Sequence, residues 1–181
     1  MGIFSGSGTA AGRGDINYIR PCHILARLDK AHIVDNCRDK VDLAAIDFTV
    51  LHDLASPDGD HSHSIGEEVN WGLKVNNDYF GDETQRIAIA LGGWEKEGGD
   101  PAECDKMLDE IFGPDNPLGG VVVEIYARNV VTTKGGDFTK ITFRRALSSA
   151  EALEALPEET VERFFPDQQL QKLAEAEAAA A

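Results

Sequence analysis

The chain has 181 residues with a formal net charge of −15, and 42 % of its residues are hydrophobic while 27 % are charged. This length fits one domain with extensions, and the composition excludes wholesale disorder. No apolar run reaches the roughly 20 residues that span a bilayer, and residues 1–14 lack the apolar core of a signal peptide. We therefore expect an intracellular protein that does not enter a membrane. Its three cysteines contain no CxxC pair, so we expect reduced thiols and neither a disulfide framework nor a zinc site.

The charge is distributed unevenly along the chain. From Ser148 onward there are eight acidic and two basic residues, whereas residues 119–145 hold five basic and two acidic ones. The acidic surplus argues against unassisted binding to duplex nucleic acid, because counterion release needs clustered Lys and Arg. Residues 119–145 form the one basic segment of the chain.

Hydrophobic periodicity predicts the elements in chain order, after a Gly/Ser-rich N-terminal arm over residues 1–16. Two-residue alternation predicts five strands, over 17–29, 41–54, 66–75, 120–132 and 137–146. A charged connector over 30–40 separates the first two strands, and a turn at 134–136 joins the last two. Helical spacing between Gly and Pro stop signals predicts helices over 82–91 and 101–112. Beyond Ser148 an acidic, Ala-rich helical tail is interrupted by Pro157 and Pro166.

Three strands, a helical insertion and a final hairpin are the element order of the OB-fold, a five-stranded Greek-key barrel that binds oligonucleotides or oligosaccharides. We therefore predict an α+β protein, mainly β, with an OB-fold-like barrel over 17–147 and a C-terminal helical tail over 148–181. An SH3-like barrel or an unrelated α+β sheet fits less well, since neither explains helices between the third and fourth strands. In an OB-fold the loops at 30–40 and 133–137 would flank the binding surface.

Four segments carry a resemblance to a known family: YIRPCHILARLDK, IDFTVLHDLA, HSIGEEVNWGLKV and VEIYARNVVTTKGGDFTKITF. From Tyr18 to Arg144 the chain resembles the OB-fold single-stranded DNA-binding proteins of tailed bacteriophages. The resemblance implies sequence-independent binding of single-stranded DNA in phage DNA replication or recombination, in the cytoplasm of the bacterial host. It also implies replication or recombination proteins as partners through the C-terminal tail, and it leaves a homo-oligomer open.

Single-strand binding needs rings for base stacking and cations along the phosphate path. Strand alternation places Tyr126 and Arg128 outward on the fourth strand if its valines face the core. On the fifth strand it places Phe138, Lys140 and Arg144 outward. The rings would stack bases and the cations would contact phosphates. The alternative is that these are ordinary solvent-facing side chains of a half-exposed hairpin.

Three further residues are candidates for the same interface. Lys134 lies at the predicted hairpin tip. Trp71 and Lys74 lie on the third strand, where Trp71 would be a stacking platform beside the lysine. The two-residue period of Trp71 matches Val69 and Leu73, however, and this favours a core position.

No catalytic, cofactor or metal site is predicted. The chain has no GxSxG, no Walker loop and no nucleophile with an identifiable base. The only local group that resembles metal ligands is better explained as a solvated loop: Asp58, Asp60, His61 and His63. The rival to DNA binding is a non-enzymatic structural or protein-interaction module of a phage particle or host-takeover complex. A third hypothesis is an enzyme of nucleotide metabolism.

Overall fold

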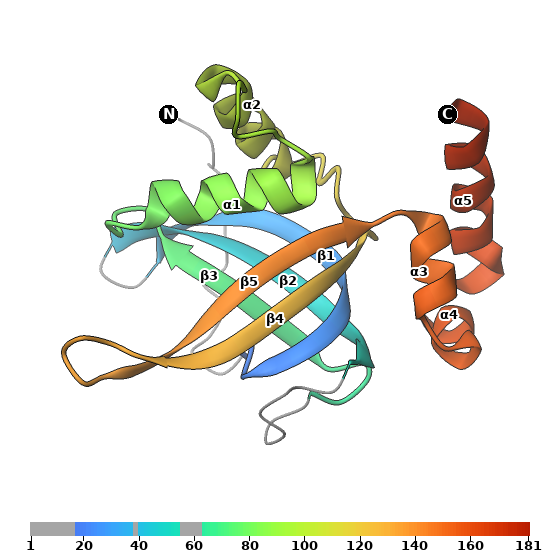
Figure 1. Ribbon diagram of the computed structural model, residues 1–181, viewed down its shortest axis with the longest axis horizontal. Coiled ribbons are helices and arrows are strands. Elements are labelled where there is room, and N and C mark those ends of the chain that lie inside the picture. Colours follow the sequence, from blue (N-terminus) through green and yellow to red (C-terminus); the bar gives the residue numbers. More distant parts are fainter. Residues whose placement is uncertain (1–16, 38–39, 55–62) are drawn as a thin grey trace. The chain divides into compact units, whose positions relative to one another are not determined.

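The computed structural model describes residues 17–37, 40–54 and 63–181 (Figure 1). Within them the chain is an α+β protein with one five-stranded antiparallel sheet of order β3-β2-β1-β4-β5 and five α-helices. The predicted N-terminal arm lies outside the described residues. The elements are β1 (Cys22–Cys37), β2 (Val41–Asp53), β3 (Glu68–Lys74), α1 (Phe80–Gly92), α2 (Pro101–Ile111), β4 (Val122–Val131), β5 (Asp137–Leu147), α3 (Ser149–Ala155), α4 (Glu158–Phe164), a short 3₁₀ turn η2 (Pro166–Gln168) and α5 (Gln169–Ala180).

The predicted α+β class and the order of strands and helices are confirmed. The sheet order ends at β3 and β5 and is not closed within the described residues, so the barrel stays a prediction. The main correction concerns residues 30–40, because β1 continues to Cys37 through most of the expected connector. Charged residues there occupy a strand that still buries Leu28 and Ala31, and Ile33 and Val34 are β-branched strand formers.

The chain divides into two compact units. Unit 1 comprises the described residues of Met1–Ile19, Leu28–Phe48 and Glu68–Gly119, and unit 2 those of Arg20–Arg27, Thr49–Glu67 and Gly120–Ala181. The strands β1 and β2 therefore contribute residues to both units, whereas β4 and β5 belong to unit 2 and β3 belongs to unit 1.

Unit 1 holds α1 and α2. The helix α1 ends at Gly93, whose positive φ of 73° glycine adopts without strain. The first turn of α2 is capped by Asp100, whose side chain accepts a hydrogen bond from the Ala102 amide at 2.9 Å. The side chain of Asn116, beyond α2, hydrogen-bonds the backbone of β1 at Asp29 and Ala31 and so ties the segment before β4 to that strand.

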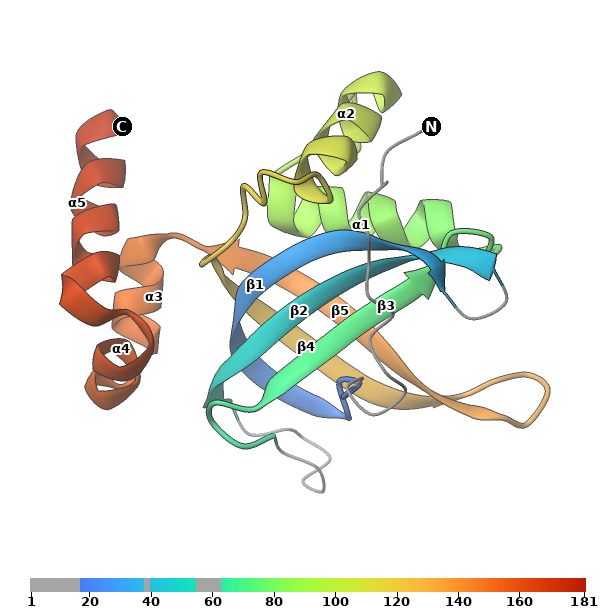
Figure 2. The same ribbon diagram turned by 180° about the vertical axis from the view of Figure 1, so that it is seen from behind.

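Unit 2 is built around an apolar cluster to which the C-terminal helices contribute directly. Leu25, Leu51, Val122 and Leu147 come from the strands. The helical residues of the same cluster are Ala152, Leu156, Val161, Phe165 and Leu170. As the sequence predicts, the helical segment is interrupted at Pro157 and Pro166, and these breaks let α3, α4 and α5 fold back on one another (Figure 2).

Polar contacts fix these helices in unit 2. A reciprocal capping box between Ser148 and Glu151 starts α3. The guanidinium of Arg27 on β1 donates to the carbonyl of Phe164 at 2.9 Å, and Ser149 donates to the Glu177 carboxylate of α5 at 2.7 Å. None of the helices that the structure describes is long and apolar enough to cross a bilayer.

Candidate nucleic-acid interface

The β4–β5 hairpin brings together six of the residues that the sequence singles out. Its register pairs Tyr126 with Thr142, Arg128 with Lys140, and Val130 with Phe138. Cross-strand partners point to the same side of a sheet, so these side chains share one face, as alternation predicts. We call this the hairpin face. Asp137 pairs with Val131 and therefore lies on the opposite side.

The hairpin face is covered at one end and open at the other. Val122 and Leu147 are buried there under the C-terminal helices, whereas Arg128 is exposed and Phe138 is 49 % exposed. The β1 ladder runs only from Val122 to Ala127 of β4, so beyond Ala127 the hairpin is a two-stranded ribbon (Figure 1). Gly135, with a φ of +79°, provides the left-handed conformation that its turn needs, and Lys134 is exposed beside it.

Arg128 and Lys140 lie directly opposite each other on this face. Among the described residues neither has an ion pair or a side-chain hydrogen bond. Like charges that face each other across a strand pair destabilise the sheet. This pair of cations is therefore available to an anion from outside the protein.

Tyr126 is held by its neighbours. Its ring meets the His23 ring edge to face, with centroids 5.7 Å apart, and the Arg144 guanidinium lies 5.1 Å from its centroid. A cation over a ring face attracts the ring quadrupole, which fixes both side chains. The Tyr126 ring is thus preorganised by His23 and Arg144.

Glu124 is the centre of a charge cluster on the same face. Its carboxylate lies 2.9 Å from His23 Nε2, 3.5 Å from Arg144 Nη1 and 3.4 Å from Arg145 Nε. Arg145 also donates to Glu151 on α3. Burial alone would raise the pKa of Glu124, but hydrogen bonds from His23 and Arg145 outweigh it and hold that pKa below its ordinary value.

A β-bulge explains why two arginines reach one carboxylate. The register shifts between Glu124 and Ile125, so Arg145 opposes Glu124, Phe143 opposes Ile125, and Arg144 is the extra residue. Local sequence pattern did not indicate the roles of His23, Glu124 and Arg145. The Arg-Arg doublet in an alternating strand was the available signal, since strict alternation would place one arginine on the buried side.

Trp71 and Lys74, the two remaining candidates, lie in unit 1. Trp71 is only 7 % exposed, which agrees with the core position that its period favours. Lys74, the last residue of β3, is exposed. The structure thus gathers Tyr126, Arg128, Lys134, Phe138, Lys140 and Arg144 on one hairpin and leaves these two elsewhere in the chain.

Of the four residues that resemble metal ligands in the sequence, only His63 is among the described residues. Asp58, Asp60 and His61 lie outside the described residues. His63 is buried, accepts a hydrogen bond from the Arg20 amide at 3.0 Å, and lies 3.1 Å from Glu67. The described residues contain no cluster of three or more His, Cys, Asp or Glu side chains placed to hold a metal.

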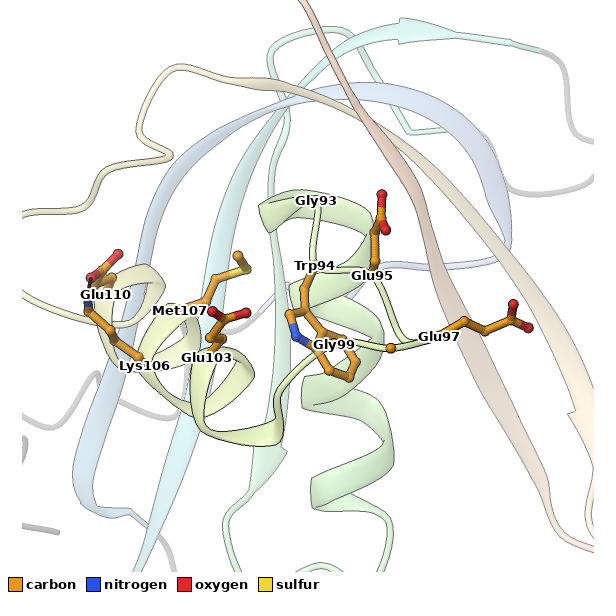
Figure 3. A pocket seen from close by; sticks show the side chains of 10 residues that line it. Gly93, Trp94, Glu95, Glu97, Gly99, Glu103, Lys106, Met107 and Glu110 are labelled. Carbon is orange, nitrogen blue, oxygen red and sulfur yellow. Dashed lines mark ion pairs between the residues drawn. The ribbon is translucent and has the colours of Figure 1, made fainter.

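Unit 1 contains a pocket of about 580 Å³ between the loop after α1 and α2 (Figure 3). Trp94, Gly99 and Met107 line it, and its rim carries four glutamates and one lysine: Glu95, Glu97, Glu103, Glu110 and Lys106. The net negative rim repels phosphate, which disfavours nucleic acid as a ligand of this pocket.

The chain matches no protein-family model and no curated protein.

Proposed function

We propose that this chain binds single-stranded DNA without sequence preference, through the hairpin face of β4 and β5. The observation that carries the proposal is the facing pair Arg128 and Lys140, which has no anionic partner among the described residues and lies beside an exposed phenyl ring. A DNA phosphate would neutralise the repulsion between these two cations, and an unpaired base would stack on the Phe138 ring.

The spacing along β5 suits that ligand. Phe138 and Lys140 are two residues apart on one face, which corresponds to about 7 Å along a strand. A base on Phe138 and a phosphate on Lys140 would belong to neighbouring parts of one strand. Tyr126 and Lys134 would extend the contact toward the two ends of the hairpin.

The element order supports the same proposal. A barrel of strand order β3-β2-β1-β4-β5 would close between β3 and β5, and the OB-fold is a partly open barrel of five strands. From the resemblance to tailed-phage single-stranded DNA-binding proteins, we infer a role in phage DNA replication or recombination, in the host cytoplasm. The activity proposed needs neither catalysis nor a cofactor.

Titration of a labelled oligo-dT at several salt concentrations tests this function. Lys140→Ala should reduce the magnitude of the slope of log K against log salt by about 0.7, the value for one phosphate contact on a single strand. Phe138→Ala should weaken binding by roughly 1–3 kcal/mol, or about 5- to 150-fold, without changing the slope. Lys96→Ala, which removes an exposed lysine outside the hairpin, is the control. Absence of binding at low salt, or equal effects of all three variants, would refute the proposal.

One observation favours the rival function. The hairpin tip exposes apolar side chains on both sides, with Val131 71 % exposed and Phe138 49 % exposed. Such a tip also suits docking to another protein. A protein-interaction module would bind no oligo-dT in the titration above, so the same experiment separates the two.

A further inference from the structure

The hairpin face carries one carboxylate among its described residues, that of Glu124, and it lies among cations. The Glu124 side chain is only 16 % exposed, and three cationic or protonatable groups surround it at 2.9–3.5 Å. A carboxylate that accepts a hydrogen bond from one guanidinium and forms an ion pair with a second makes the kinds of contact that a DNA phosphate would make.

We propose that Glu124 is a built-in competitor of phosphate that keeps Arg144 from the DNA strand and so limits both the affinity of the hairpin face and its dependence on salt. This inference rests on the proposed function. It divides the hairpin face into an outer part, where Arg128 and Lys140 contact phosphate, and an inner part that is already neutralised.

Arg144 is the cation that Glu124 controls. Arg145 has a second carboxylate, Glu151, and stays occupied if Glu124 is neutralised. The only anionic partner of Arg144 among the described residues is Glu124, and the Arg144 side chain is 49 % exposed. The bulge holds Arg144 on the open side, where its guanidinium rests over Tyr126. Without the Glu124 charge, Arg144 would be free to contact phosphate.

Glu124→Gln tests the inference, because the amide keeps the shape of the side chain and an oxygen that still accepts from His23 and Arg145. The variant should bind oligo-dT more tightly at low salt, and the magnitude of its salt slope should rise by about 0.7 for one added phosphate contact. The gain should shrink about fivefold for each tenfold rise in salt. Structural damage would instead weaken binding.

Three further variants complete the experiment. Glu103→Gln on α2 makes the same change in net charge outside the hairpin and should leave the slope unchanged. Arg144→Gln alone should also leave it unchanged, whereas adding Arg144→Gln to Glu124→Gln should return the slope to the wild-type value.

The outcomes separate the two proposals. No binding of oligo-dT by the wild-type chain refutes the proposed function. Binding that depends on Lys140, combined with equal slopes for Glu124→Gln and Glu103→Gln, leaves the function standing and refutes the role of Glu124. A slope that stays raised in the double variant refutes the assignment of Arg144.

Discussion

Lys140→Glu should make the folded protein more stable while weakening its binding to single-stranded DNA. The wild-type hairpin opposes two cations, Arg128 and Lys140, and the substitution converts them into an ion pair. A general structural defect would not produce these opposite changes, because damage to the hairpin would lower both the stability and the DNA affinity.

The expected stabilisation follows from the register. A favourable cross-strand charge pair contributes roughly 0.2–1 kcal/mol and a like-charge pair costs a similar amount. Because Arg128 is exposed and Lys140 is partly buried, solvent screening keeps the total change near 1 kcal/mol. For a chain of this length that corresponds to a rise in Tm of about 2–4 °C.

The binding change has the opposite sign. The substitution removes one phosphate contact and places a carboxylate on the DNA path, so the salt slope should fall by about 0.7 in magnitude and the affinity at low salt by at least about tenfold. Thermal unfolding followed by circular dichroism and anisotropy titration with oligo-dT measure the two effects. Lys96→Glu changes the net charge equally outside the hairpin and should alter neither quantity appreciably. A Lys140→Glu protein that melts below wild type, or that keeps wild-type affinity, would show that the opposed cations are not an unsatisfied phosphate site.

Four further predictions concern unit 2 and the packing of unit 1. Ser148→Ala removes the capping box of α3 and should lower the free energy of unfolding by about 1 kcal/mol in urea titration; no change would mean that α3 forms without its cap. Phe165→Ala opens a cavity in the apolar cluster and should cost about 3–5 kcal/mol, and a loss below 1 kcal/mol would show that α4 does not pack as described. Burial, followed by the nearby Asp53 charge, raises the pKa of the Cys22 thiol to about 12, so at pH 8 this cysteine should resist a thiol reagent until the protein unfolds; rapid labelling of the native protein would contradict its burial. Gly99→Ala should destabilise by about 1–3 kcal/mol in the same titration, since its Cβ would lie 2.1 Å from the Glu95 carbonyl oxygen, and an unchanged midpoint would place that loop differently.

Local pattern predicts most of the secondary structure here, and the hairpin shows why. Turn glycines and an alternating pattern, interrupted only at the Arg144 bulge, define β4, β5 and the face that their side chains share. The extent of β1 was not predictable in this way, because residues 30–40 look like a charged loop until β1 pairs with β2, its other neighbour in the sheet. Propensity is overridden by such non-local pairing.

The charge cluster around Glu124 could not be predicted from local pattern for a related reason. His23 and Glu124 are about a hundred positions apart in the chain and meet only through the β1–β4 register. The bulge at Arg144 depends on the pairing of both strands, so neither strand alone reveals that two arginines share one carboxylate. The sequence shows a basic segment, whereas the fold decides which of its cations are already neutralised.

The attachment of α3, α4 and α5 to the sheet has a practical consequence for deletion experiments. A shortened protein ending at Leu147 would expose Leu25, Leu51 and Val122 to water, and such a patch favours aggregation. If deletion of these acidic helices abolished binding to DNA or to a partner, the damaged hydrophobic core would be a sufficient cause. Point substitutions on the outer surface of the helices test their binding role without this damage.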